Sequence, residues 1–128
     1  MPTGLSVATA NGMLNGLRNA PFQVAALWVR LFTADPGATF DKSPAAEATR
    51  QQVTFSAASN GQLISSNTPT WVNITGSEIA SHFVAYDDQV AGTARFSGQL
   101  LPLVEYQAGD TVSIAPGDMV VDFQIATD

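Results

Sequence analysis

The sequence predicts a mainly β protein: an antiparallel β-sandwich of jelly-roll-like or barrel-like form, with one short N-terminal helix. Three observations lead to this prediction. The 128 residues match a common size for one domain, so we expect a single domain over 1–128. Short segments of alternating hydrophobicity fill the chain from residue 69 onward. Turn signals separate these segments at about 8–12 residues, which is typical of sandwiches and barrels.

Residues 6–18 form the one helix that the pattern predicts. The apolar side chains that share one face at helical spacing are Ala10, Met13, Leu14 and Leu17. Ser6 or Thr9 can cap the start, and Asn19 favours an end. Two internal glycines each lower helix stability by about 1 kcal/mol relative to alanine. We therefore expect the helix to form only with its apolar face docked on the rest of the protein.

Residues 22–33 are apolar on both faces of an extended chain, so we expect a strand covered on both sides, with the helix over one face. A helix is the alternative for this run, but its β-branched and aromatic content and the turn at 35–37 favour a strand. Residues 38–49 lack any period and are predicted to be an exposed loop. Further strands are expected at 50–56, 62–65, 70–75, 79–86, 93–101, 103–106, 111–115 and 119–126. The turn residues between 86 and 93 predict that the strands on either side form a hairpin.

The charge pattern excludes several classes of function. Five basic residues stand against eleven acidic ones, for a net charge of −6. The basic residues are scattered: Arg18, Arg30, Lys42, Arg50 and Arg95. A nucleic-acid site needs a basic stripe, and an acidic surface repels both DNA and anionic lipid. With no cysteine, no evident signal peptide and no apolar run near ~18 residues, we expect a soluble protein made in a cytoplasm.

The side chains that can carry chemistry have simpler structural interpretations. His82 is the only histidine, and in a strand the adjacent Ser81 falls on the opposite face, so an outward polar position is expected. Aspartates are common in turns because they bond their own backbone; calcium binding is the weaker alternative. The turn candidates are Asp87, Asp88, Asp110 and Asp118. The sequence therefore predicts no enzyme, no cofactor and no metal site.

Four aromatic residues are candidates for a sugar-binding platform. Trp28 lies among apolar residues and is expected in the core, whereas Trp71 fits either environment. Tyr86 and Tyr106 lie near turns, so we expect them to be partly exposed, with their hydroxyls in water or bonded to a partner. Burial in the core or in an interface remains the default expectation for all four.

The order of several short segments resembles a family of small structural proteins of tailed-bacteriophage virions. These segments are MLNGL (13–17), LWVRLFTADPG (27–37), RQQVTF (50–55), HFVAYDD (82–88), RFSGQL (95–100), AGDTV (108–112) and PGDMVV (116–121). The resemblance implies a non-enzymatic β-protein of the phage particle. Family members commonly have a loop richer in Gly and Ser, with a tyrosine where this chain has Thr49.

The resemblance and the acidic composition together predict a capsid decoration or cementing protein on the outer head surface. Its expected partners are the major capsid protein or a tail protein of the virion, and copies of itself as a homo-trimer. Two alternatives stay open: a tail-associated fibre or baseplate protein, and a carbohydrate-binding β-sandwich. A hydrolase that uses His82 has the least support. The expected partner-contact residues are Met13, Leu14, Leu17, Lys42, Trp71 and Tyr106.

Overall fold

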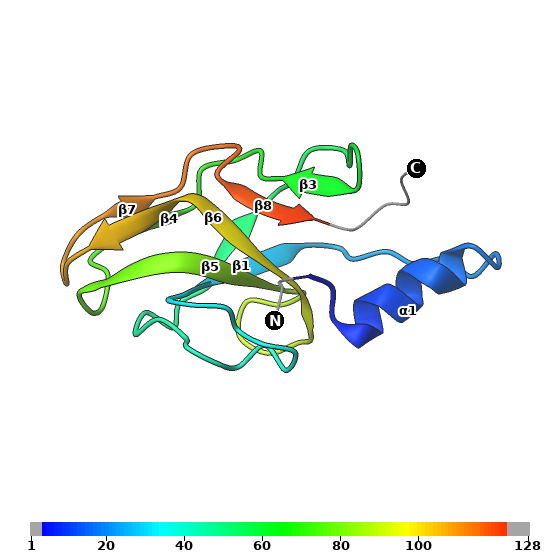
Figure 1. Ribbon diagram of the computed structural model, residues 1–128, viewed down its shortest axis with the longest axis horizontal. Coiled ribbons are helices and arrows are strands. Elements are labelled where there is room, and N and C mark those ends of the chain that lie inside the picture. The colour runs from blue at the N-terminus through cyan, green and yellow to red at the C-terminus, as the bar shows by residue number, and fades with distance from the viewer. Residues whose placement is uncertain (1–3, 123–128) are drawn as a thin grey trace.

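The computed structural model describes residues 4–122, which form one helix and eight strands. The elements are α1 (Val7–Gly16), β1 (Leu27–Phe32), β2 (Gln51–Val53), β3 (Gln62–Ile64), β4 (Thr70–Trp71), β5 (Glu78–Tyr86), β6 (Ala94–Tyr106), β7 (Val112–Ser113) and β8 (Met119–Asp122). Six strands form a curled antiparallel sheet in the order β2-β1-β5-β6-β8-β3, and β4 pairs with β7 beside it (Figure 1). The predicted mainly β class with one short helix is confirmed. The strand predicted over 119–126 is confirmed up to residue 122, and its remaining positions lie outside the described residues.

The hairpin of β5 and β6 forms the centre of the large sheet. Its register runs from Glu78 opposite Tyr106 to Tyr86 opposite Ala94, which confirms the predicted hairpin. The separate strands predicted at 93–101 and 103–106 are wrong, because β6 continues through Pro102. A register shift accommodates the proline, since β6 bulges at this point and proline is tolerated in bulges.

Buried apolar side chains from both sheets form one core cluster. Its larger members are Val29, Leu31, Trp71, Ile74, Phe83, Phe96, Leu100, Tyr106, Ile114, Met119 and Val121. Burying a side chain of this size contributes about 1.5–3 kcal/mol relative to leaving it exposed. The small sheet therefore shares its core with the large one.

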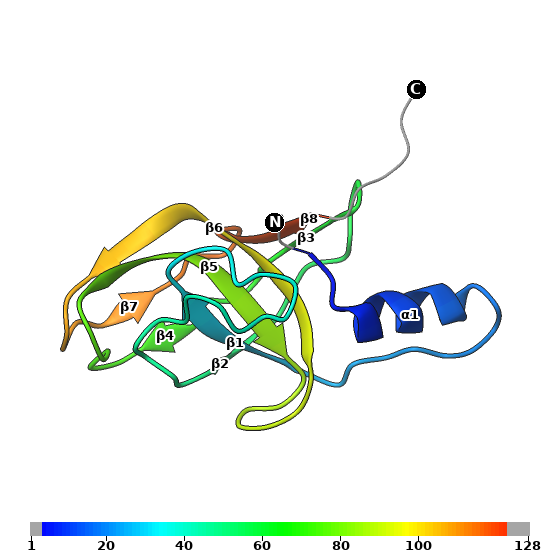
Figure 2. The same ribbon diagram turned by 60° about the horizontal axis from the view of Figure 1, so that its bottom comes forward.

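The helix forms as predicted but packs differently. The Ser6 hydroxyl accepts a hydrogen bond from the Thr9 backbone N–H (3.1 Å), and Asn19 takes a positive φ of 67° just beyond the helix. The predicted docking face is wrong, because Thr9 is the buried residue of α1, while Leu14 and Leu17 are 60% and 85% exposed. The helix projects from the body beside the start of β6 (Figure 2).

The segment after the helix is shorter as a strand than its apolar pattern suggested. Only β1 is regular, and residues 22–26 lead back from the helix without strand pairing. Phe22 lies so close to Gly12 that a β-carbon at position 12 would collide with the phenyl ring. The aromatic side chain therefore anchors the return segment to α1 rather than filling a sheet face.

The loop at 38–49 contains no helix or strand, yet it is joined to the sheet. β2 pairs with the first half of β1, and this loop lies along the same edge of its second half, where the Ala45 N–H donates to the Leu31 carbonyl (3.1 Å). Most of its side chains are exposed, but Ala45 and Glu47 are buried. The loop therefore extends the sheet at the edge of β1, and its Ala45 side chain joins the core.

Glu47 fixes the loop to the body of the protein. Its carboxylate accepts hydrogen bonds from the backbone N–H groups of Thr75 (2.8 Å) and Thr49 (3.2 Å). Burial raises the pKa of the Glu47 carboxyl, but these hydrogen bonds lower it further, so that pKa lies below its ordinary value of 4.5. The ionised carboxylate is therefore part of the folded structure.

We predict that Gly98→Ala destabilises the protein by about 1–3 kcal/mol. A β-carbon at position 98 would clash with the Val120 carbonyl oxygen and the Phe83 ring, both of which are held by the sheet. Urea unfolding followed by tryptophan fluorescence measures the change. Gly16→Ala is the control, because its β-carbon meets nothing within 4 Å and the helix gains about 1 kcal/mol. Equal stability of the two variants would contradict the packing at Gly98.

We predict that Glu47→Gln lowers stability by about 1–3 kcal/mol at pH 7, since an amide cannot accept both backbone hydrogen bonds in this geometry. The Glu47 pKa is lowered on folding, so its contribution is complete above pH 4.5 and declines as the pH falls through and below that value. Unfolding curves of the two proteins should thus converge in acid. A difference that stays constant down to pH 3 would refute the role of the carboxylate.

Candidate functional site

His82 and Ser81 are in contact, contrary to the expectation that they lie on opposite strand faces. The Ser81 hydroxyl lies 2.7 Å from His82 Nδ1, at the place where the register of the β5–β6 pairing shifts. The same hydroxyl donates to the Thr33 carbonyl at 3.0 Å, so its proton is directed away from the imidazole. A nucleophilic serine must instead give its proton to the histidine. The pair therefore ties two segments together without activating the serine.

Three of the four turn aspartates bond their own turn, as the sequence predicted, whereas the Asp118 side chain has no hydrogen bond. Asp87 accepts from the Thr93 N–H (2.8 Å) and forms an ion pair with Arg95 (2.9 Å). The Thr93 N–H lowers the pKa of Asp87, and Arg95 lowers it further. Asp88 accepts from two N–H groups of the same turn. Within residues 4–122, no group of three His, Asp or Glu side chains is placed to hold a metal ion.

The proposed aromatic sugar platform is wrong for its two main members. Trp71 and Tyr106 are only 1% and 3% exposed, so neither can stack on a sugar or contact a partner. The Trp71 indole N–H donates to the Thr49 carbonyl (2.9 Å), and the Tyr106 hydroxyl donates to Glu78 (3.2 Å). Burial raises the pKa of the Tyr106 phenol, and the Glu78 carboxylate raises it further. Both polar atoms are satisfied inside the protein, which is why these large side chains can be core residues.

The other two aromatic residues are half-buried. Trp28 was expected in the core, but its position in β1 leaves it partly exposed. The Arg50 guanidinium lies over the Tyr86 ring, 3.6 Å from its centre. This stacking covers the ring face that a sugar would need.

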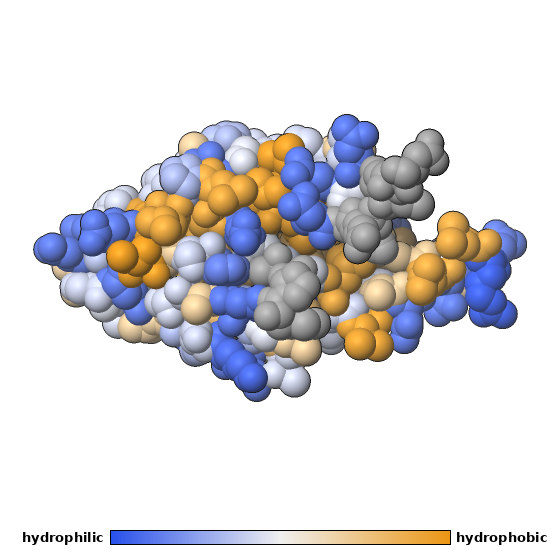
Figure 3. Space-filling view, in the orientation of Figure 1, coloured by the Kyte–Doolittle hydropathy of each residue, from blue (hydrophilic) through white to orange (hydrophobic). Residues whose placement is uncertain are grey.

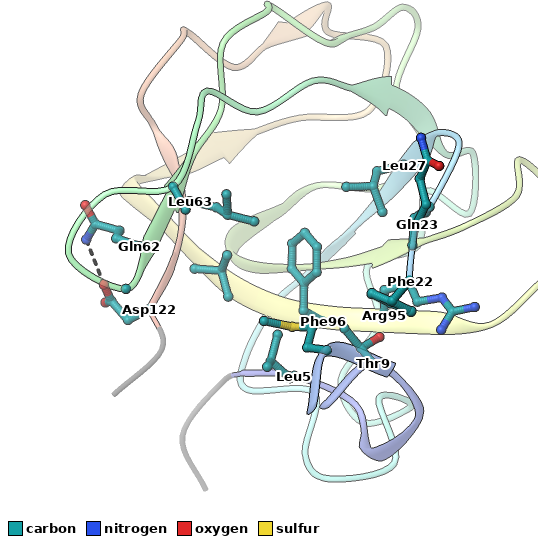
Figure 4. A pocket seen from close by; sticks show the side chains of 15 residues that line it. Leu5, Thr9, Phe22, Gln23, Leu27, Gln62, Leu63, Arg95, Phe96 and Asp122 are labelled. Atoms are coloured by element: carbon teal, nitrogen blue, oxygen red, sulfur yellow. Dashed lines mark hydrogen bonds between the residues drawn. The ribbon is translucent and has the colours of Figure 1, made fainter. Parts of the chain in front are cut away.

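An apolar groove of about 390 Å³ lies between α1 and the large sheet (Figure 4). Its apolar lining comes from both parts and includes Leu5, Met13, Phe22, Leu63, Phe96 and Val121. Two of the polar side chains at its edge are engaged elsewhere: Gln62 donates to Asp122 (2.7 Å), and Arg95 is paired with Asp87. The groove therefore offers apolar contact and no group poised for catalysis.

The exposed apolar side chains of α1 continue this surface. Met13, Leu14 and Leu17 are 44%, 60% and 85% exposed, and Figure 3 shows apolar surface along the projecting helix. Lys42 is exposed in the loop at 38–49. Four of the six expected contact residues are thus accessible, whereas Trp71 and Tyr106 are not. No helix of the described residues is long and apolar enough to cross a membrane.

A second surface was missed by the sequence analysis. Arg30, Arg50, Thr49, Gln89 and Val90 line a hollow of about 470 Å³ on the side of the hairpin turn. Arg30 lies in β1 and Arg50 directly precedes β2, and their proximity follows from the pairing of β1 with both β2 and β5. Two scattered arginines in a sequence carry no local signal that would have predicted this hollow.

Comparison with known proteins agrees with the resemblance noted in the sequence. A family model described as podophage GP4 fiber I protein gp80 matches residues 4–122. No curated protein matches the chain. The expected membership of a structural protein family of tailed phages is confirmed. The match spans all the elements described above, and the chain belongs to the podophage fiber I protein gp80 family.

Proposed function

We propose that the chain is a non-enzymatic structural subunit of a phage fibre, built into the virion through contacts with other proteins. The match to a fiber protein family over residues 4–122 is the observation that carries this proposal. The geometry is consistent with it: the accessible surfaces are apolar or charged, and His82 is not poised to activate Ser81.

The fibre role takes precedence over the head decoration that composition and resemblance first favoured. Both roles suit an acidic β-protein that repeats in a particle, but the family description names a fiber protein. The carbohydrate-binding alternative loses its support, because Trp71 and Tyr106 are buried.

The contact with the carrier protein of the particle involves α1. The helix projects from the body and leaves Leu14 and Leu17 largely in solvent, although exposed apolar side chains of this size gain from burial. Copies of the chain associate with one another through a different surface, and a homo-trimer is the expected assembly.

We predict that the protein is found in the tail fraction when purified particles are separated into heads and tails. An antibody against the purified chain, applied to both fractions, provides the measurement. Detection in heads alone would replace the fibre role with head decoration. Absence from intact particles would overturn the proposal.

We predict that Leu14→Asp with Leu17→Asp abolishes incorporation into particles while leaving the fold intact. Both side chains are largely exposed, so the substitutions remove little burial from the isolated protein. Complementation of a phage lacking the gene, with particle composition as readout, measures incorporation, and circular dichroism checks the fold. Ala8→Asp with Asn15→Asp is the control, because these exposed positions lie on another side of α1 and add the same charge. Equal incorporation of the two double variants would contradict a role for this face.

A further inference from the structure

Two arginines of this acidic chain converge on one hollow. Arg30 belongs to β1 and Arg50 directly precedes β2, and together with Gln89 and Val90 they line a space of about 470 Å³. The chain has a net charge of −6 and only five basic residues. Two of the five basic residues thus line one small hollow, and their positive charges attract anions to it.

Both guanidinium groups are held in place by neutral partners. Arg50 stacks on Tyr86 and donates to the carbonyls of Asp88 (3.0 Å) and Ala91 (2.7 Å). Arg30 donates to the Ala45 carbonyl (3.0 Å), and its Nε is buried without a partner. The carboxylate of Asp87 pairs with Arg95. Among the described residues, no carboxylate lies within ion-pair distance of Arg30 or Arg50.

The unused donors define the chemistry of a ligand. Each guanidinium has five N–H donors, and the hydrogen bonds above occupy a minority of them. The planar fork of an arginine matches a carboxylate, and charge-assisted hydrogen bonds of this kind are the strongest in proteins. A carboxylate framed by apolar groups fits best, because Val90 at the border is 83% exposed.

One carboxylate of the chain has this form. Of the acidic side chains in residues 4–122, Glu105 and Asp118 have no side-chain hydrogen bond or ion pair, whereas the others are engaged in their own turns, loops or strands. Glu105 is exposed and lies directly opposite Ile79 in the β5–β6 pairing, so both side chains share one face. Ile79 and Leu103 beside it are 45% and 56% exposed.

Glu105 cannot reach the hollow of its own molecule. Arg50 is bonded to the turn that precedes β6, whereas Glu105 lies near the far end of that strand (Figure 1). Glu105 follows Ala94 by eleven positions, which corresponds to roughly 35 Å of strand. The two features lie at opposite ends of β6, so they can meet only between copies.

We propose that the hollow between Arg30 and Arg50 is a carboxylate site filled by Glu105 of a neighbouring copy. Ile79 and Leu103 of that copy cover Val90 and exclude water from the ion pair. The contact joins different surfaces of successive copies, so it closes into a ring when the rotation allows it. This inference rests on the proposed function, because it names the contact by which fibre subunits associate.

Charge reversal tests the contact with the full chain in solution. Sedimentation of the wild type, Glu105→Arg and Arg50→Glu over a range of concentrations gives the dissociation constant of self-association. Each variant alone should weaken association by roughly tenfold or more. An equimolar mixture of the two should associate more tightly than either variant alone, since the hollow of one variant meets a side chain of opposite charge wherever the two variants are neighbours.

Asp118→Arg is the matched control, because it makes the same charge change at the other unpartnered carboxylate and should associate like the wild type. Arg50 also supports Tyr86 and the hairpin turn, so Arg30→Glu provides a second reversal if Arg50→Glu unfolds. Unchanged association of Glu105→Arg, equal weakening by Asp118→Arg, or a wild type that stays monomeric would overturn the inference. Failure of the fibre role itself would appear separately, as absence of the chain from purified particles.

Discussion

Strand β6 pairs with β5 on both sides of its bulge at Pro102, and this pairing positions the other parts of the protein. β5 carries Phe83, Val84 and Ala85, all fully buried, and its second edge pairs with β1. β6 receives β8 near its middle, where Gly98 permits a close approach to the Val120 carbonyl. Helix α1 lies against the start of β6, and the outer face with Glu105 lies at its end. The middle of β6 is thus part of the core, while its start contacts α1 and its end carries the exposed Glu105.

The acidic residues show how the protein uses its charge. Most carboxylates accept hydrogen bonds from backbone N–H groups, as Glu47 does for the loop at 38–49 and Asp88 for the hairpin turn. These carboxylate–backbone hydrogen bonds stabilise loops and turns in place of salt bridges, because the chain has only five basic residues. The arginines of the hollow are correspondingly left with neutral partners. The arginines of the hollow can therefore form ion pairs with carboxylates of another molecule.

Much of the fold could be predicted because its signals are local. Alternation and turn residues act within a few positions, so the hairpin and the Ser6 cap were predicted correctly. The predictions fail where the environment of a residue depends on parts of the chain that are distant in the sequence. Trp71 is buried because a loop carbonyl satisfies its N–H. Leu14 and Leu17 share an apolar face, yet their spacing does not indicate whether this face packs against the same molecule or against another one. The hollow depends on β1 meeting two strands far away in the sequence.

The central claim is that this protein acts through contacts between copies and with a carrier in the particle. A density map of the intact virion tests that claim most directly. The account predicts adjacent copies of this fold in the fibre density, with α1 toward the carrier and the end of β6 against the next copy. Isolated single copies, or a fibre whose density does not accommodate the curled sheet, would contradict it.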